Sequence, residues 1–171
     1  MEENRIILVD FFDREIGAAE KLEAHEKGLL HRAFSVFIFS GERLLMQKRA
    51  AGKYHSAGLW ANTCCSHPRV GETLCDAAKR RLFEEAGIEL QPEEAGSFVY
   101  RAVFENGLTE FELDHVFTAE YDGDFKPDPD EAAEMCWKNI ADIAEDMRAH
   151  PENYAPWFIT AFLIAVKSRN N

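Results

Sequence analysis

The segment from Leu59 to Ile88 constrains the fold of this chain most strongly, because it predicts a short extended run, a Pro/Gly turn and one helix with both ends marked. Thr73, followed three residues later by Asp76, is typical of a helix N-terminus, and Gly87 stands where a left-handed residue commonly ends a helix. Between these ends runs an apolar stripe at four-residue spacing, made of Leu74, Ala78, Leu82 and Ala86. The segment therefore predicts an amphipathic helix entered through a turn.

The same helix carries charged residues on a second face. Arg81 and Glu85 are four residues apart and therefore share that face. Two cysteines and a histidine, Cys64, Cys65 and His67, precede the turn. An ordinary strand–turn–helix with a surface ion pair explains this pattern as well as a functional site does.

The helix resembles the Nudix box, G-x5-E-x7-R-E-U-x-E-E-x-G-U. The residues at its defined positions are Ser66, Glu72, Arg80, Arg81, Leu82, Glu84, Glu85, Gly87 and Ile88. Ser66 replaces the opening glycine, and Arg81 replaces a glutamate that binds metal in Nudix hydrolases. With ANTCCSHP before it, the altered box resembles the type 1 isopentenyl-diphosphate isomerases, a Nudix-fold family that isomerises and does not hydrolyse.

Further motifs of that family are scattered along the chain. They are HEKGLLHRAFS from His25, LLMQKRA followed by Lys53, YRA at Tyr100, the E-x-E of Glu110 and Glu112, and APW at Trp157. The resemblance implies an α+β fold, a Nudix-type α/β/α sandwich with a mixed sheet, formed by residues 1–171 as one domain.

The resemblance also implies a set of site residues. One divalent ion, Mn²⁺, Zn²⁺ or Mg²⁺, would be held by His25, His31, His67, Glu110 and Glu112. A further Mg²⁺ would sit on Glu85 and the substrate diphosphate. Substrate binding falls to Lys21, Arg49, Lys53, Ser66, Arg81 and Trp157. The catalytic residues would be Cys65, which lies two before the His-Pro pair, with Glu112 and Tyr100.

The chemistry of the implied reaction explains these residue types. Shifting an unactivated double bond requires one proton to be added to carbon and another to be removed, through a tertiary carbocation. Glu112, bound to metal near Tyr100, would donate, and Cys65 as a thiolate would accept, with the two roles exchanged in the reverse direction. The ring face of Trp157 could stabilise the cation, and water must be excluded.

Net charge limits the partners of this chain of 171 residues. A formal charge of −12 disfavours nucleic acid and anionic membranes, so an anionic small substrate needs local Lys, Arg or metal. Four cysteines do not form a disulfide framework, and the N-terminus lacks the pattern of a signal peptide. We expect a cytoplasmic protein, a monomer or weak homodimer, with isopentenyl or dimethylallyl diphosphate as its partner.

Hydrophobic periodicity predicts the remaining elements. Strands are expected at 5–9, 33–39, 43–48, 97–105, 108–121 and 134–137, and helices at 14–24, 139–149 and 157–166. In the strand from Leu108, three carboxylates alternate with apolar residues and share one face: Glu110, Glu112 and Asp114. That face is either an exposed acidic surface or a site where a cation relieves the repulsion.

Two other functions are compatible with a Nudix-like chain. A Nudix diphosphatase would need the carboxylate that Arg81 replaces, and it would leave Cys65 and the histidines without a role. A non-catalytic binding module or a structural metal site is the second alternative. Three histidines with two glutamates are a poor structural zinc set, since such sites prefer cysteine-rich tetrahedral ligands.

Overall fold

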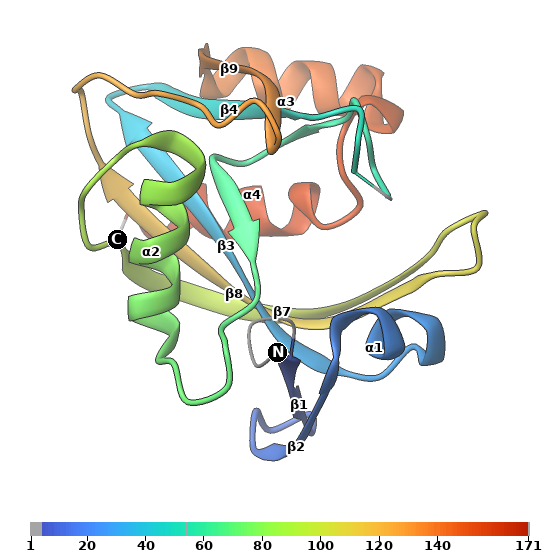
Figure 1. Ribbon diagram of the computed structural model, residues 1–171. Coiled ribbons are helices and arrows are strands. Elements are labelled where there is room, and N and C mark those ends of the chain that lie inside the picture. Colours follow the sequence, from blue (N-terminus) through green and yellow to red (C-terminus); the bar gives the residue numbers. More distant parts are fainter. Residues whose placement is uncertain (1–4, 54, 171) are drawn as a thin grey trace.

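The computed structural model describes residues 5–53 and 55–170, and within them the chain forms nine strands in one mixed sheet and four α-helices (Figure 1). The strands are β1 (Arg5–Val9), β2 (Glu15–Glu20), β3 (His31–Ser40), β4 (Arg43–Arg49), β5 (Trp60–Ala61), β6 (Cys64–Ser66), β7 (Glu93–Val103), β8 (Thr109–Glu120) and β9 (Ala132–Asn139). The helices are α1 (Lys21–Lys27), α2 (Leu74–Ala86), α3 (Ile140–Ala149) and α4 (Phe158–Ser168), with a short 3-10 helix at Pro151–Asn153. None of the described helices is both long and apolar enough to cross a bilayer.

The sheet divides into two parts that meet at the β3–β4 turn. β3 runs parallel to β8, in register from the His31–Glu112 pair to the Phe39–Glu120 pair, and β7 continues this part as the antiparallel neighbour of β8. β4 pairs with β3 only next to the turn and otherwise with β9. Between the diverging strands, β5 pairs with β4 and β6 pairs with β3. The segment 60–66 therefore lies where the two parts separate.

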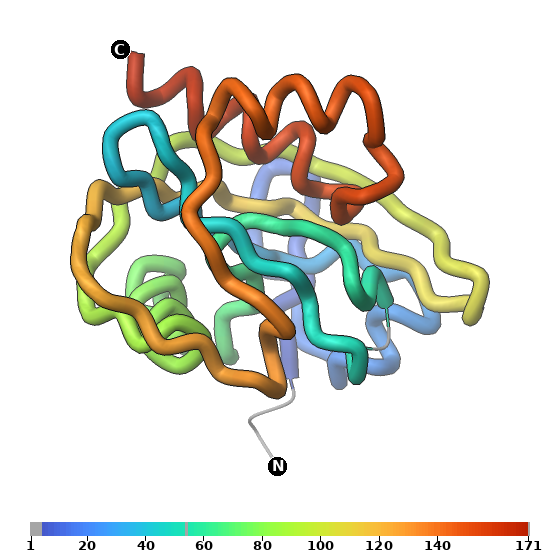
Figure 2. The backbone as a smooth tube through the Cα atoms, turned by 90° about the horizontal axis from the view of Figure 1, so that it is seen from above, coloured from blue at the N-terminus to red at the C-terminus, as the bar shows by residue number. Residues whose placement is uncertain are grey.

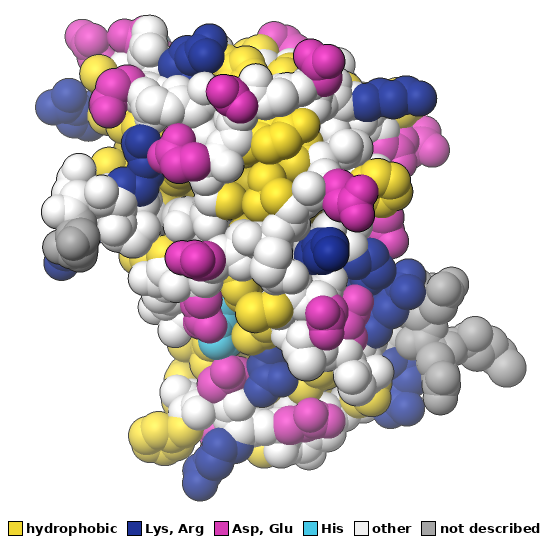
Figure 3. Space-filling view, turned by 90° about the vertical axis from the view of Figure 1, so that its left-hand side faces the viewer, with side chains coloured by type: hydrophobic (Ala, Val, Ile, Leu, Met, Phe, Trp, Pro, Cys, Tyr) yellow, Lys and Arg dark blue, Asp and Glu magenta, His cyan; other side chains and the backbone are white. Residues whose placement is uncertain are grey.

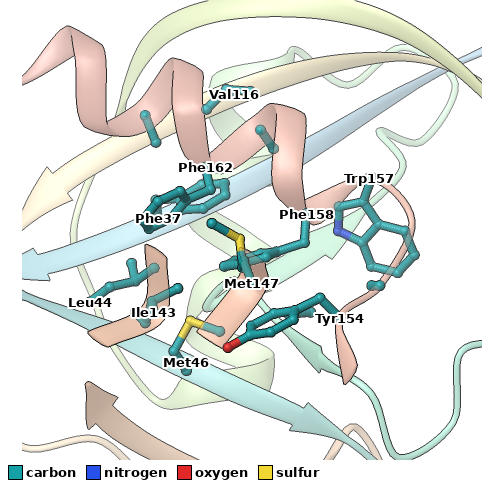
Figure 4. Packing of buried hydrophobic residues seen from close by; sticks show 14 of the residues in the cluster. Phe37, Leu44, Met46, Val116, Ile143, Met147, Tyr154, Trp157, Phe158 and Phe162 are labelled. Atoms are coloured by element: carbon teal, nitrogen blue, oxygen red, sulfur yellow. The ribbon is translucent and has the colours of Figure 1, made fainter. Parts of the chain in front are cut away.

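Alternating residues of the central strands build two apolar cores, one on each face of the sheet. Phe37 and Phe39 of β3 pack with α3 and α4 in the first core, which Figure 4 shows with Trp157 at its edge. Val36 and Ile38 point the other way, into the core beneath α2. The tube view shows α3 and α4 along the same edge of the molecule (Figure 2). The expected α/β/α sandwich is confirmed.

The ends of α2 are formed as the sequence predicts. The Thr73 hydroxyl accepts a hydrogen bond from the Asp76 backbone N–H at 3.2 Å. Gly87 has φ of 67°, and a Cβ there would lie 3.3 Å from the side chain of Lys126. Of the predicted stripe, Ala78, Leu82 and Ala86 are fully buried, whereas Leu74 is partly buried.

The helix expected at 14–24 is wrong for its first half. Residues 15–20 form β2, and α1 begins only at Lys21. β2 pairs antiparallel with β1, from Arg5 opposite Glu20 to Val9 opposite Glu15. This pairing satisfies the backbone of a segment whose helix propensity is weak, so the neighbouring strand decides its conformation.

Leu82 anchors α2 and is expected to contribute strongly to stability. Its side chain is completely buried in the core beneath α2. We expect Leu82→Ala to lower the free energy of unfolding in urea by about 3 kcal/mol, because the substitution leaves a cavity. Leu163→Ala is the matched control, since Leu163 is 61% exposed, and it should change stability little. Equal losses in the two variants would contradict the assigned packing.

Candidate active site

Three histidines and a glutamate from four segments converge on one buried point. His25 lies on α1, His31 begins β3, His67 follows β6 and Glu112 lies on β8. One ligand atom from each of these residues lies within 4.8 Å of the others. The Glu112 Oε1 atom is 3.3 Å from Nε2 of His31 and 2.9 Å from Nε2 of His67. The parallel β3–β8 register places His31 directly opposite Glu112.

Backbone carbonyls fix the orientation of two of the imidazoles. Nδ1 of His25 lies 2.6 Å from the Lys21 carbonyl oxygen, and Nδ1 of His31 lies 2.8 Å from that of Leu29. A carbonyl only accepts, so each Nδ1 donates. Neutral His31 then directs an Nε2 lone pair at a carboxylate oxygen, an arrangement that a proton or a metal cation stabilises. The donor set therefore fits a divalent metal ion, since metal-binding histidines are commonly oriented this way.

The pKa values in the cluster reflect burial and the charge of Glu112. Burial lowers the pKa of His25 to about 4 and that of His67 to about 3, so both are neutral and able to bind metal. Burial also disfavours charged His31, but the hydrogen bond and charge of Glu112 outweigh this effect and raise its pKa. Burial opposes ionisation of Glu112, yet hydrogen bonds from His31 and His67 hold its pKa well below the usual range.

Glu110 lies beside this group but has different neighbours. The Tyr100 hydroxyl is 2.8 Å from Oε2 of Glu110 and 2.5 Å from Oε2 of Glu112, so it bridges the two carboxylates. His55 Nε2 is 2.9 Å from Glu110 Oε1. Burial and the charge of Glu112 raise the pKa of Glu110. Glu110 therefore groups with His25 and His55, whereas sequence analysis placed it with the other ligands and missed His55.

The third carboxylate of β8 shares the same face, as the alternation predicts. Glu110, Glu112 and Asp114 are all buried and line one pocket, so the alternative of an exposed acidic strand face is wrong. Ser35 donates a hydrogen bond to Asp114 at 2.8 Å. Burial and the charge of Glu112 raise the pKa of Asp114 well above its usual range.

The adjacent cysteines face opposite sides of the sheet, as alternation predicts. Cys64 is fully buried in the core beneath α2, whereas Cys65 lines the pocket with the β8 carboxylates. Arg49 Nη1 lies 3.8 Å from Cys65 Sγ. Burial raises the pKa of the Cys65 thiol, and the charge of Arg49 opposes that rise only in part. The pocket as described favours the neutral thiol, in contrast to the thiolate that the resemblance implied.

The same pocket is lined by Ser66 and by the cationic residues Lys21, Arg49, Lys53 and Arg81. Arg81 contacts Glu84, Glu85 and Glu131 at 2.9, 2.5 and 3.0 Å. Lys53 also pairs with Glu131. Figure 3 shows the side of the molecule that lies on the left in Figure 1, where Lys and Arg side chains gather toward the right-hand edge of the view. The structure adds Glu131 to the predicted set, and no sequence motif marked it.

Glu85 is separate from the histidine cluster. It is buried on α2 and accepts hydrogen bonds from Arg81 and from Gln47 Nε2 at 3.1 Å. Burial raises its pKa to about 7, although Arg81 opposes the shift. Glu85 therefore lies beside Arg81 and apart from the histidines. The Mg²⁺ ion expected on Glu85 and the diphosphate stays a prediction.

Trp157 also lines the pocket. It precedes α4, and its Nε1 donates to Asn62 Oδ1 at 3.0 Å. The Arg49 guanidinium lies 5.2 Å from its ring centroid, and the Tyr100 ring lies 6.4 Å away. Asn62 also donates to the Cys64 carbonyl at 2.6 Å, so it links the position of Trp157 to the cysteine strand.

Comparison with known proteins first identifies the class. The NUDIX domain model matches residues 29–158. A protein from Deinococcus radiodurans shares the fold with a TM-score of 0.74 at 19% identity, covering 94% of this chain and 96% of the other. A MutT protein from Methanosarcina mazei gives a TM-score of 0.68 at 19% identity, covering 83% and 96%. The fold is therefore that of a Nudix domain.

Curated relatives then identify the family. Isopentenyl-diphosphate Delta-isomerase 2 of Aromatoleum aromaticum is 48% identical, over 98% of this chain and 90% of its own length. Isopentenyl-diphosphate Delta-isomerase 1 of the same organism is 54% identical, over 91% and 88%. The Burkholderia multivorans isopentenyl-diphosphate Delta-isomerase is 50% identical, over 91% and 89%. The chain belongs to the isopentenyl-diphosphate Delta-isomerase family, as the altered Nudix box indicated.

Proposed function

We propose that this chain isomerises isopentenyl diphosphate to dimethylallyl diphosphate, and that it does so in isoprenoid biosynthesis. One observation carries the proposal. Cys65 and Glu112, on the strands that flank β3, line one pocket that also contains Arg49, Lys53 and Arg81. An allylic shift needs two proton-carrying groups around the alkene, and the diphosphate needs cations. The pocket supplies both the proton-carrying groups and the cations.

We assign a divalent ion to His25, His31, His67 and Glu112, with Glu110 as an adjacent ligand. Imidazoles with carboxylates suit Mn²⁺ or Zn²⁺ better than Mg²⁺. When bound, this ion supplies positive charge that stabilises the buried carboxylates. A separate Mg²⁺ on Glu85 would suit the substrate diphosphate, since Mg²⁺ commonly takes one or two carboxylates together with phosphate oxygens.

The protein groups then balance the proton transfers. One proton is added to the terminal alkene carbon, and one is removed from C2. In the pocket as described, Cys65 holds a proton and Glu112 does not, so the pair begins with one donor and one acceptor. The assignment implied by the resemblance, with Glu112 as donor and Cys65 as base, has the same proton count in the opposite direction. The Tyr100 hydroxyl orients Glu112, and Trp157 covers the alkene end and helps to exclude water.

The cations explain why the diphosphate would remain intact. Arg81 stands where a Nudix hydrolase places a metal-binding glutamate. In the substrate-free pocket its guanidinium is held by Glu85 and Glu131. A diphosphate could accept hydrogen bonds from that guanidinium, and from Arg49 and Lys53, in a fixed geometry. We infer that this end of the site holds the substrate and activates no water against phosphorus.

Deuterium incorporation from solvent, together with a phosphate assay, tests the proposed function. In D₂O with Mg²⁺ and isopentenyl diphosphate, we expect dimethylallyl diphosphate that carries deuterium in a methyl group, followed by deuterium at C2 as the reaction reverses. NMR measures both positions, and a phosphate assay should detect no phosphate or pyrophosphate above background. Deuterium enters because solvent exchanges with the acidic protons of Cys65 and Glu112.

Two results would contradict the proposal. Phosphate release with an undeuterated carbon skeleton would establish a hydrolase. Neither change, in protein shown to contain its metal, would favour a binding module. Boiled protein and a reaction with excess chelator are the controls for spontaneous exchange and for metal dependence.

A further inference from the structure

His55 is a partly buried residue of the pocket that no motif singled out. It lies in the connection between β4 and β5, and its side chain is 8% exposed. The imidazole stacks on Phe104, with ring centroids 4.9 Å apart and an interplanar angle of 20°. It also meets the Trp157 ring edge-on, at 6.2 Å between centroids. These contacts hold His55 with its Nε2 directed at Glu110, 2.9 Å from Oε1.

Among the residues that the structure describes, two overlapping groups of side chains could hold a metal ion. The first consists of His25, His31, His67 and Glu112, and the second of His25, His55 and Glu110. In each group the ligand atoms lie within 4.8 Å of one another. The Tyr100 hydroxyl connects the groups, because it contacts both Glu110 and Glu112.

The shared histidine shows how the two groups are related. Nδ1 of His25 donates to the Lys21 carbonyl oxygen at 2.6 Å, so this histidine can bind an ion only through Nε2. A single nitrogen lone pair binds one ion. The two groups do not merge into one set within that distance, so an ion on His25 is shared by both groups only when His55 and Glu110 move toward the first group.

We propose that His55 is a further ligand of this ion and, with Glu110, completes a set of six coordinating side chains. The proposal rests on the proposed function for the presence of an ion at His25. Six donors favour an ion that accepts six ligands, and four imidazoles favour a transition metal, so Mn²⁺ fits the set better than Zn²⁺ or Mg²⁺. The connection from β4 to β5, which also carries Lys53, would then link metal binding to the diphosphate end.

A substitution can separate this role from a simpler one. His55 could act only as a hydrogen-bond donor that positions Glu110. The amide of a glutamine can replace the donor, but its nitrogen does not bind metal. The amide oxygen of glutamine is a weaker ligand than an imidazole nitrogen, so His55→Gln preserves a positioning role and weakens a ligand role, whereas His55→Ala removes both.

The test is a Mn²⁺ titration of the full-length protein, freed of metal by a chelator, with electron paramagnetic resonance to quantify free Mn²⁺. The variants are His55→Ala and His55→Gln, and the matched control is His150→Ala, since the His150 side chain is 58% exposed and contacts Glu152. We expect one tightly bound ion in the unmodified protein. Both His55 variants should raise the dissociation constant by at least about 10- to 100-fold, the loss that removal of a residue merely supporting a metal ligand commonly causes, and His150→Ala should not. Circular dichroism of each variant checks the fold.

Two results would overturn the assignment. Recovery of binding in His55→Gln but not in His55→Ala would make His55 a positioning residue for Glu110. Unchanged binding in both variants would remove His55 from the metal centre. The titration contains no substrate, so either of these results would leave the proposed isomerisation unaffected. Absence of tight Mn²⁺ binding in the unmodified protein would instead overturn the metal centre itself.

Discussion

Cys65→Ala should reduce isomerisation by about 10³- to 10⁴-fold while leaving the fold intact, because it removes one of the two groups that we propose to exchange protons with carbon. Cys65 lines the pocket together with the β8 carboxylates and lies 3.8 Å from Arg49 Nη1. Loss of the thiol removes no cation from the pocket. Diphosphate binding, measured by calorimetry with a substrate analogue, should therefore change little.

The neighbouring cysteine provides a closely matched control. Cys64 has the same side chain one residue earlier but is fully buried in the core beneath α2. Cys64→Ala should keep its activity and cost about 1 kcal/mol of stability, since a small apolar group is lost from a packed core. If both variants lose activity equally, the strand-facing argument fails and the catalytic sulfur is wrongly assigned.

Glu112→Gln should have an effect of similar size, about 10³-fold or more on turnover, for two reasons that act together. The carboxylate is the second proton-carrying group of the proposed pair, and one of its oxygens lies within 3.3 Å of two histidine nitrogens. The neutral amide cannot accept a proton at neutral pH and is a weaker metal ligand. We expect both turnover and metal content to fall, measured by NMR assay and by elemental analysis of purified protein.

Glu105→Gln is the control for this change of charge. Glu105 is exposed at the turn of the same β7–β8 hairpin, so its substitution removes one negative charge without entering the pocket. Turnover and metal content should both remain at the level of the unmodified protein. Normal turnover in Glu112→Gln would exclude Glu112 from proton transfer, whatever its effect on the metal.

The sequence by itself determined those features that depend on local periodicity. The capping residue Thr73, the stripe through Leu82 and the terminal Gly87 specify α2 without reference to any other segment. Alternation likewise assigned opposite faces to Cys64 and Cys65, and a common face to the β8 carboxylates. The altered Nudix box indicated the family because its substitutions lie within one contiguous segment and can be recognised from the sequence alone. The helix predicted at 14–24 is wrong for residues 15–20 because local periodicity does not report the neighbouring strand, and β1 lies next to β2 only in the folded chain.

Only the tertiary structure decided how the site is composed. The parallel register of β3 and β8 brings His31 opposite Glu112 across a sequence separation of 81 residues, and no local pattern reports such a pairing. Glu131 and His55 carry no motif, and they become pocket residues because the chain folds back onto Arg81 and Glu110. The charge states follow from the same cause. Burial disfavours ions, and nearby partners restore them selectively, so the protonation of Cys65 and Glu112 depends on their neighbours in space.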